Sequence, residues 1–205
     1  MLAELFPDGL PLRATERGLW LATPLPVLLA ALDALLDGGW LGPGRASRLL
    51  DAGAGDGRVI GAFGERAAGR LPLELLGIEH DPALFACAGR NLEALRATGR
   101  LPGGYALVEG DYLAAATYAR LGVAPSEIDL VINYPDGNEE ALERWLASHG
   151  GARTRLILLG PDHSLAFRIL DLAWSTRLED PNGTTWSLIV SEPVAAAGRS
   201  PASEA

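Results

Sequence analysis

The stretch Arg48-Leu49-Leu50-Asp51-Ala52-Gly53-Ala54-Gly55-Asp56-Gly57-Arg58 decides how this sequence folds. Residues 48–51 form a short apolar run typical of a buried strand, and a helix is expected to begin at about Arg58. The glycines at 53, 55 and 57 form the tight turn between them, because glycine tolerates backbone conformations that other residues avoid. Without side chains, the turn lets backbone N–H groups approach a ligand, and the helix N-terminus adds a positive partial charge.

Outward from this turn, β-rich runs alternate with helical patterns, which is typical of a mostly parallel sheet with helices on both faces. We expect strands at residues 48–51, 73–79, 105–109, 128–133, 155–159, 173–179 and 185–191, with helices between the first five. Asp81 and Pro82 start one such helix, because Asp caps a helix and Pro suits its first position. The sequence therefore predicts an α/β fold with a doubly wound, seven-stranded sheet.

The two ends of the chain differ from this pattern. Asp180-Pro181-Asn182-Gly183 is too short for a crossover helix, so it predicts an antiparallel hairpin of the last two strands. Near the start, Thr23-Pro24 begins a helix with a broad apolar stripe that Gly38-Gly39 ends. We expect an N-terminal helical cap over residues 1–44, a ligand-binding domain over 45–192, and a flexible tail over 193–205.

Carboxylates follow the next two strands. Glu79 ends the second strand and is placed to accept both hydroxyls of a ribose, whereas Asp111 follows the third strand, where an adenine amine would lie. The fingerprint of nicotinamide dinucleotide sites, G-x-G-x-x-G, does not fit, because Arg58 or Ile60 stands at its last position. These spacings favour an adenosine-containing ligand.

Four segments resemble motifs of the class I S-adenosylmethionine (SAM)-dependent methyltransferases: LLDAGAGDGRV (49–59), GIEHDP (77–82), VEGDYL (108–113) and IDLVINYPD (128–136). The resemblance covers residues 45–191 and implies a Rossmann-like methyltransferase fold with SAM as cofactor. In that family the glycine loop holds the methionine part of SAM, and the acidic residues after the next two strands bind ribose and adenine. It implies cofactor contacts at Gly53, Gly55, Gly57, Glu79 and Asp111. We also predict cofactor contacts at Asp51, Ala54, His80, Tyr112 and Asn133.

The segment upstream of the loop carries a weaker resemblance. LWLATPLPVLLAALDAL, residues 19–35, is similar to the Thr-Pro segment of small prokaryotic protein-lysine methyltransferases. A capped amphipathic helix gives the same letters for structural reasons alone. The subfamily therefore stays open.

Asn133-Tyr134-Pro135-Asp136 is the candidate acceptor site, and we predict catalytic roles for Asn133, Tyr134 and Asp136. The motif resembles the N-P-P-Y signature of enzymes that methylate planar nitrogens, in which Asn accepts a hydrogen from the target and the aromatic stacks on it. Tyr134 replaces a Pro and Asp136 replaces the aromatic, which puts an adenine or amide target in doubt. An acid there favours a cationic amine. The competing interpretation is that Asp136 and Glu139, at capping-box spacing, only start a helix at 140–148.

Several further residues are weaker candidates. His163 follows the fifth strand and is a candidate proton acceptor. Trp20 and Tyr112 are candidates to cover the cofactor, although packing is the commoner role of such aromatics. Cys87 and Asp129 are expected to be structural. No two His or Cys residues have metal-ligand spacing, so we expect no metal.

Composition limits the partners of this protein. The chain has 205 residues, 48% of them hydrophobic, which suits one domain, and its net charge is −9 with no lysine. Bulk nucleic acid is a disfavoured partner, because affinity for phosphates comes mainly from basic side chains. The sequence has neither a bilayer-length apolar run nor the basic start of a signal peptide, so we expect a cytoplasmic protein without a membrane partner.

The function therefore has one leading interpretation and two rivals. The leading one is transfer of a methyl group from SAM to a nucleophile, expected to be nitrogen, of an unknown protein or small molecule. A SAM-binding regulatory or partner protein without catalysis is the first rival. A nucleotide-sugar or dinucleotide enzyme on a similar sheet is the second. The oligomeric state stays open.

Overall fold

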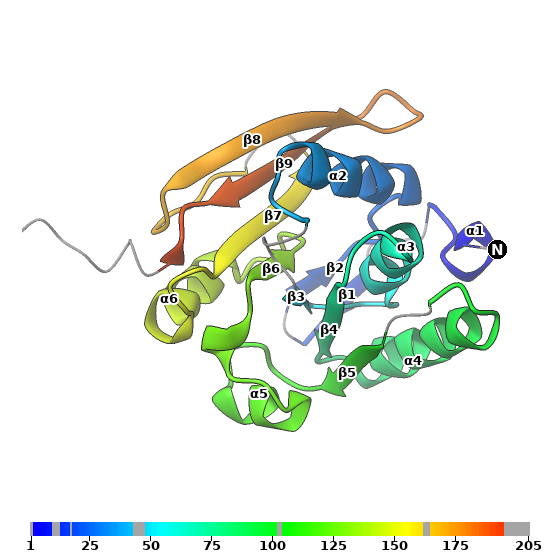
Figure 1. Cartoon of the computed structure of the whole chain (residues 1–205), viewed down its shortest axis with the longest axis horizontal. Helices are drawn as coiled ribbons and strands as arrows, with labels where there is room; N and C mark the ends of the chain where they lie inside the picture. The colour runs from blue at the N-terminus through cyan, green and yellow to red at the C-terminus, as the bar shows by residue number, and fades with distance from the viewer. Residues whose placement is uncertain are drawn as a thin grey trace, which may run out of the picture.

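The computed structural model describes residues 2–9, 13–16, 18–42, 48–101, 104–161 and 165–194. Its centre is a seven-stranded sheet in the order β5-β4-β3-β6-β7-β9-β8 (Figure 1). The strands are β3 (Arg48–Ala52), β4 (Glu74–Glu79), β5 (Tyr105–Glu109), β6 (Leu130–Asn133), β7 (Arg155–Pro161), β8 (Leu172–Glu179) and β9 (Thr185–Ser191). The first five are parallel, and β9 runs antiparallel between β7 and β8. The predicted fold class, including its antiparallel edge, is confirmed.

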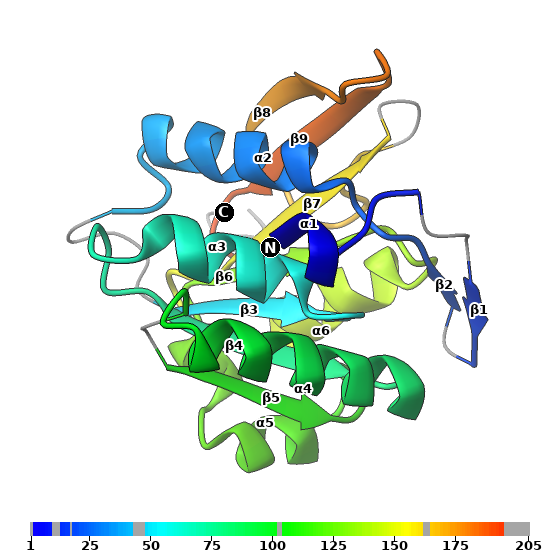
Figure 2. The ribbon, with the colours of Figure 1, turned by 90° about the vertical axis from the view of Figure 1, so that its right-hand side faces the viewer.

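Helices cover both faces of this sheet. α2 (Leu25–Asp37), α3 (Arg58–Ala67) and α4 (Pro82–Ala97) lie side by side on one face, and α5 (Ala115–Leu121) and α6 (Glu139–His149) cover the other (Figure 2). Successive strand residues supply the two cores in turn, so Leu49 packs toward α2 to α4 and Leu50 toward α5 and α6. A short 3-10 turn, η1 (Pro125–Glu127), precedes β6. Within the described ranges, every helix is too short or too polar to cross a bilayer.

The N-terminal segment contains more than the predicted helix. After α1 (Leu2–Leu5), β1 (Arg13–Thr15) and β2 (Gly18–Trp20) pair as an antiparallel hairpin that the sequence analysis did not predict. Strands of three residues carry too little periodic pattern to be recognised. Figure 2 shows the hairpin beside the edge of the sheet toward which β3, β4 and β5 point. The helix predicted after Thr23-Pro24 is confirmed as α2.

A buried carboxylate holds the connection between β7 and β8, whose described part, residues 165–171, contains no helix. Glu143 of α6 is fully buried, and its side chain accepts hydrogen bonds from the backbone N–H groups of Arg168, Ile169 and Leu170 at 2.7 to 3.0 Å. One side chain thus satisfies donors that a helix would satisfy internally. After β9, Val194 is buried and its N–H donates to the Thr154 carbonyl. Residues 195–205 lie outside the described chain.

Replacing Glu143 by Gln is expected to lower the free energy of unfolding by about 1–3 kcal/mol, because the amide NH2 group would face backbone donors that lose their acceptor. Urea unfolding followed by circular dichroism measures the change. Glu140→Gln is the matched control, because Glu140 lies exposed on the same helix in an ion pair with Arg144. That variant should stay within about 0.5 kcal/mol of wild type, and equal effects of both variants would contradict a special role for Glu143.

Candidate functional site

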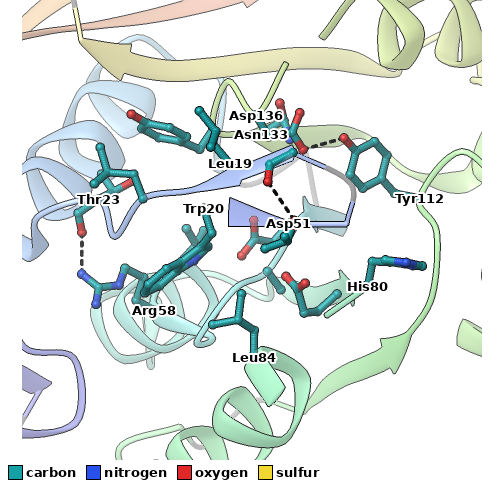
Figure 3. Close-up of a pocket in the computed structure, with 18 of the residues that line it drawn as sticks. Leu19, Trp20, Thr23, Asp51, Arg58, His80, Leu84, Tyr112, Asn133 and Asp136 are labelled. Atoms are coloured by element: carbon teal, nitrogen blue, oxygen red, sulfur yellow. Dashed lines mark hydrogen bonds between the residues drawn. The ribbon is translucent and has the colours of Figure 1, made fainter. Parts of the chain in front are cut away.

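A pocket lies at the carboxyl ends of β3, β4 and β6, under the β1–β2 hairpin (Figure 3). Its lining consists of Thr15, Gly18, Leu19, Trp20, Leu21, Thr23, Leu28, Asp51, Gly53, Ala54, Arg58, Val59, Glu79, His80, Leu84, Tyr112, Asn133, Tyr134, Asp136 and Leu159. From β3 the sheet extends to β4 and β5 on one side and to β6 and β7 on the other. Open α/β sheets bind ligands at this kind of switch point.

The glycine loop after β3 is fastened to the end of β4. Its three glycines have positive φ angles, from +57° to +94°. The N–H groups of Gly53 and Ala54 donate to the Ile78 carbonyl at 3.0 and 2.9 Å, and that of Gly55 donates to Glu79 Oε2 at 2.6 Å. From the sequence, the N–H groups of this loop were expected to approach a ligand. In the structure these three have partners inside the protein instead, so the loop forms a fixed floor.

The indole of Trp20 lies directly over this floor. A Cβ atom at Gly55 would lie 2.2 Å from Trp20 Nε1, and the φ of +57° there also favours glycine. Glycine therefore allows the close approach of the ring. With Trp20 in place the cavity measures about 80 Å³, below the roughly 300–1,000 Å³ of pockets that hold small-molecule ligands. A ligand as large as SAM requires the indole to shift.

The hairpin that carries Trp20 is attached at both ends of the pocket. At one end Arg13 Nη2 lies 3.2 Å from Asp81 Oδ2, at the start of α4. At the other end the Leu19 N–H donates to the Asp136 carbonyl at 3.3 Å. A Cβ atom at Gly18 would lie 2.3 Å from that same oxygen, so the hairpin rests closely on the loop after β6. One small hairpin thus covers the loops that follow β4 and β6.

A buried ion pair joins the N-terminal segment to the glycine loop. Arg58 Nη2 lies 2.8 Å from Asp56 Oδ2, and the two side chains are 4% and 5% exposed. The guanidinium also donates to the carbonyls of Thr23 and Pro7 at 2.8 and 3.2 Å. From the sequence, Arg58 was expected only to start a helix. The two carbonyls that its guanidinium meets lie 35 and 51 residues away, and a local motif does not reveal them.

Two carboxylates define what we call the cofactor end of the pocket, Asp51 and Glu79. Asp51 is 3% exposed, and its Oδ2 atom has no hydrogen-bond partner among the described residues. Burial raises the pKa of the Asp51 carboxyl well above its usual value, and the carboxylates of Glu79 and Asp56 raise it further. Burial also raises the pKa of Glu79, against the N–H groups of Asp81 and Gly55, which stabilise its charge.

Asp51→Asn is expected to be increasingly stable relative to wild type as the pH rises. A carboxyl whose pKa is higher in the folded than in the unfolded protein binds more protons when folded, so stability falls as the pH rises from about 3.9 through the folded pKa. Asn removes this titration. Urea unfolding at pH 5 and pH 8 compares the two proteins, with exposed Asp37→Asn as the control. A stability difference between Asp51→Asn and wild type that is independent of pH would show that folding does not raise the pKa of Asp51.

The acceptor end of the pocket, as we call it, consists of Tyr112, Asn133, Tyr134 and Asp136. Asn133 Nδ2 donates to the Ala52 carbonyl at 2.6 Å, which fixes the amide, and its buried Oδ1 has no partner among the described residues. The Tyr112 hydroxyl donates to Asp136 Oδ2 at 2.7 Å. Burial raises the pKa of Asp136, and this hydrogen bond opposes the rise. Tyr134 packs its ring against Trp186, 6.3 Å away between centroids.

The capping interpretation of Asp136 is wrong. The residue before α6 is Asn138, and Asp136 lies two residues further upstream, where its Oδ1 accepts the Asn138 N–H at 2.9 Å. Glu139 accepts the Gly137 N–H instead of closing a capping box. The Asp136 side chain therefore orders a turn and also faces the pocket.

The other predicted residues have mixed positions. His80 lines the pocket, and its Nε2 atom lies 4.0 Å from Glu16 of the hairpin turn. Asp111 is not among the described lining residues, and its Oδ1 accepts the Leu113 N–H. Asp129 is structural, because its Oδ2 accepts the Arg48 N–H at 3.1 Å. His163 lies outside the described chain. Within the described ranges, no three His, Cys, Asp or Glu side chains gather as a metal site requires.

The hairpin supplies several of the lining residues that sequence reasoning missed. Thr15, Gly18 and Leu19 belong to it, and Trp20 was recognised only as one aromatic among several. Their signal was weak, because short strands and a turn give no periodicity. The residues found in advance come instead from the ends of buried strands and from the loops that directly follow them.

Comparison with known proteins gives a likeness of structure only. No family model and no curated protein matches the sequence. The rRNA methyltransferase AviRa from Streptomyces viridochromogenes matches with a TM-score of 0.67 and 17% identity, over 97% of this chain and 96% of its own.

Two further solved structures show the same architecture. A putative class I SAM-dependent methyltransferase from Listeria monocytogenes has a TM-score of 0.62 and 15% identity, over 99% of this chain and 68% of its own. A predicted O-methyltransferase from Agrobacterium tumefaciens has a TM-score of 0.57 and 23% identity, over 81% and 79%. Together with the sheet order and the pocket under its switch point, these likenesses show that the chain has the fold of class I SAM-dependent methyltransferases.

Proposed function

We propose that this protein transfers the methyl group of SAM to a nitrogen nucleophile. The observation that carries the proposal is a pair of buried oxygens, Asp51 Oδ2 and Asn133 Oδ1, which have no partner among the described residues. They belong to the ends of neighbouring strands, β3 and β6, and both residues line one pocket (Figure 3). Unsatisfied buried acceptors are costly, so they are retained where a ligand donates to them.

SAM suits the donors and acceptors of the cofactor end. Its ammonium group would donate to Asp51, and its ribose hydroxyls would donate to Glu79, whose oxygens each keep a lone pair beside the N–H groups of Gly55 and Asp81. Gly53 and Ala54 would form the floor under the methionine part, and His80 and Tyr112 would flank the adenosine. The roles of these residues rest on the resemblance to the methyltransferase motifs and on their shared pocket.

The chemistry asks little of the protein beyond position. SAM supplies an activated methyl group and its own leaving group, so the residues must hold a nucleophile in line with that methyl and exclude water. Asn133 is suited to orient a nitrogen, because its Oδ1 accepts a hydrogen and its amide cannot turn without losing the bond to Ala52. Trp20 and the rest of the β1–β2 hairpin, which cover the pocket, would exclude water from the reacting groups.

An RNA acceptor is the second candidate, because AviRa is an rRNA methyltransferase and matches over nearly the whole of both chains. The charge of this chain argues against it, since a net charge of −9 repels a phosphate backbone. A SAM-binding protein without catalysis remains the alternative outcome, because Tyr134 and Asp136 depart from the N-P-P-Y pattern.

The test has two parts. Calorimetry with SAM, its product S-adenosylhomocysteine (SAH) and NAD should show binding of the first two and none of NAD. Incubation with SAM labelled in its methyl group, with extracts then separated into protein, nucleic acid and small-molecule fractions, should show the label on nitrogen in the protein or small-molecule fraction. SAM binding without transfer to any fraction would support a regulatory protein, and label in RNA would support the second candidate.

A further inference from the structure

We propose that the acceptor is an aliphatic amine that enters as a cation and is recognised jointly by Asn133 Oδ1 and the Asp136 carboxylate, with Tyr112 positioning that carboxylate. This inference rests on the proposed function and names the substrate class of the same site. It is carried by the charges of the pocket and by the hydrogen-bonding character of the acceptor end.

The described lining of the pocket has more acidic than basic side chains. Asp51, Glu79 and Asp136 contribute three carboxyl groups, and the one Arg among the described lining residues is Arg58. The guanidinium of Arg58 is already paired with Asp56. SAM brings one net positive charge, its ammonium group would pair with Asp51, and its neutral ribose hydroxyls would donate to Glu79. Asp136 is then left as a further negative charge at the acceptor end, which favours a cationic partner there.

The acceptor end also offers acceptors and few donors. Asn133 Nδ2 is held by the Ala52 carbonyl, so only Oδ1 faces the pocket unpaired. The hydroxyl hydrogen of Tyr112 is used in its bond to Asp136 Oδ2 (Figure 3). An ammonium group carries three N–H donors and no acceptor. It is therefore the complement of this set, whereas a carboxylate, a phosphate or a carbonyl oxygen would meet repulsion.

The same residues argue against a planar nitrogen as the target. An adenine or amide nitrogen needs an aromatic surface on which its plane can stack, and Asp136 stands at the position where that aromatic is expected. Tyr134 already packs its ring against Trp186. A planar neutral target would also bury the Asp136 carboxylate without supplying a counter-ion for its charge. An aliphatic amine has neither difficulty.

Transfer to such an amine balances with the groups present. The ammonium first gives a proton to the Asp136 carboxylate, which frees its lone pair. The N–C bond then forms as the S–C bond of SAM breaks, and the electron pair of that bond stays on sulfur as a neutral thioether. The product is the N-methylated ammonium with SAH, and Asp136 releases its proton to water. The reaction needs no oxidant or reductant.

Sinefungin tests this recognition without knowledge of the acceptor, because it is a SAM analogue in which a carbon bearing a primary amine replaces the sulfonium and its methyl group. Calorimetry would give the ratio of the SAH dissociation constant to that of sinefungin. We expect sinefungin to bind at least about tenfold more tightly than SAH. Asp136→Asn and Asn133→Ala should each reduce this ratio toward one.

Two other variants separate a specific contact from general charge. Glu139→Gln removes a neighbouring carboxylate that accepts the Gly137 N–H at 2.8 Å, and it should leave the ratio unchanged. Tyr112→Phe keeps the charge of Asp136 but removes the hydrogen bond that positions the carboxylate. The ratio of the SAH to the sinefungin dissociation constant should therefore fall only in part. This variant also tests the idea if Asp136→Asn fails to fold.

The outcomes separate this inference from the proposed function. A wild-type ratio near one, or a ratio that Asp136→Asn and Asn133→Ala leave intact, would overturn the amine assignment while SAM binding stands. Failure of both ligands to bind would overturn the proposed function as well. In a labelling assay, n-butylamine and a lysine-containing peptide separate a free amine from a side chain as its source, and methylation of either supports the class. Label found instead on a phenol, a carboxylate or a nucleobase would contradict it.

Discussion

Replacing Arg58 with alanine is expected to lower the free energy of unfolding by about 3–5 kcal/mol, because the change leaves the buried Asp56 carboxylate without its counter-ion. Asp56 is 3% exposed, so water cannot replace the guanidinium. The variant also releases the carbonyls of Thr23 and Pro7, which Arg58 holds against α3. Urea unfolding measures the loss, and weaker binding of SAM should accompany it, because the hairpin would no longer be held over the glycine loop.

Arg66→Ala is the matched control for this prediction. Arg66 lies on the same helix and pairs with Asp33 at 2.9 Å, but both side chains are more than 40% exposed. Exposed pairs contribute about 0–1 kcal/mol, so the control should be close to wild type. A second comparison replaces both members of the buried pair, as Asp56→Asn with Arg58→Met, and should recover part of the loss because it leaves no buried charge. Equal effects of Arg58→Ala and Arg66→Ala would show that the pair does not hold the fold.

Glu79→Ala is expected to weaken SAM binding by about a hundredfold or more. Each hydrogen bond from a ribose hydroxyl to a charged acceptor contributes about 1.5–3 kcal/mol, and Ala removes the acceptor of both. It also frees the Gly55 N–H, so the floor of the pocket loses its link to β4. Calorimetry with SAM and SAH measures the effect, and thermal unfolding checks that the variant is folded.

Glu109→Ala provides the control for position and residue type. Glu109 is the direct neighbour of Glu79 in the parallel pairing of β4 with β5, yet it is exposed and is not among the described lining residues. Its loss should leave SAM affinity unchanged. Unaltered binding by Glu79→Ala would remove the basis for placing SAM in this pocket.

The sheet could be predicted from the sequence because buried parallel strands are local, nearly continuous apolar runs. The predicted strands at 105–109 and 185–191 match β5 and β9, and the others differ by at most two residues at an end. Glu79 and Asn133 were found for the same reason, since each ends such a run. The fold then brings the ends of these strands to one edge, which is what places their side chains in one pocket.

The features that escaped prediction depend on contacts between distant segments. Arg58 meets carbonyls 35 and 51 residues away, and nothing near it in the sequence announces them. Asp136 had two local interpretations, and neither of them contained its contact with the Tyr112 hydroxyl, which lies 24 residues away. The hairpin is short, and its position follows from docking onto the loops after β4 and β6. In each case tertiary contacts determine the position of the residue or hairpin, so a local sequence pattern cannot reveal it.

Attachment of the β1–β2 hairpin to both ends of the pocket has a kinetic consequence. Arg13 links it to the start of α4, and Leu19 links it to the loop after β6. Under the proposed function, a SAM molecule that enters this pocket displaces the indole of Trp20 and so disturbs the cover over the acceptor end. Exchange of spent cofactor and departure of product would then share one gate, and turnover could run no faster than that gate opens.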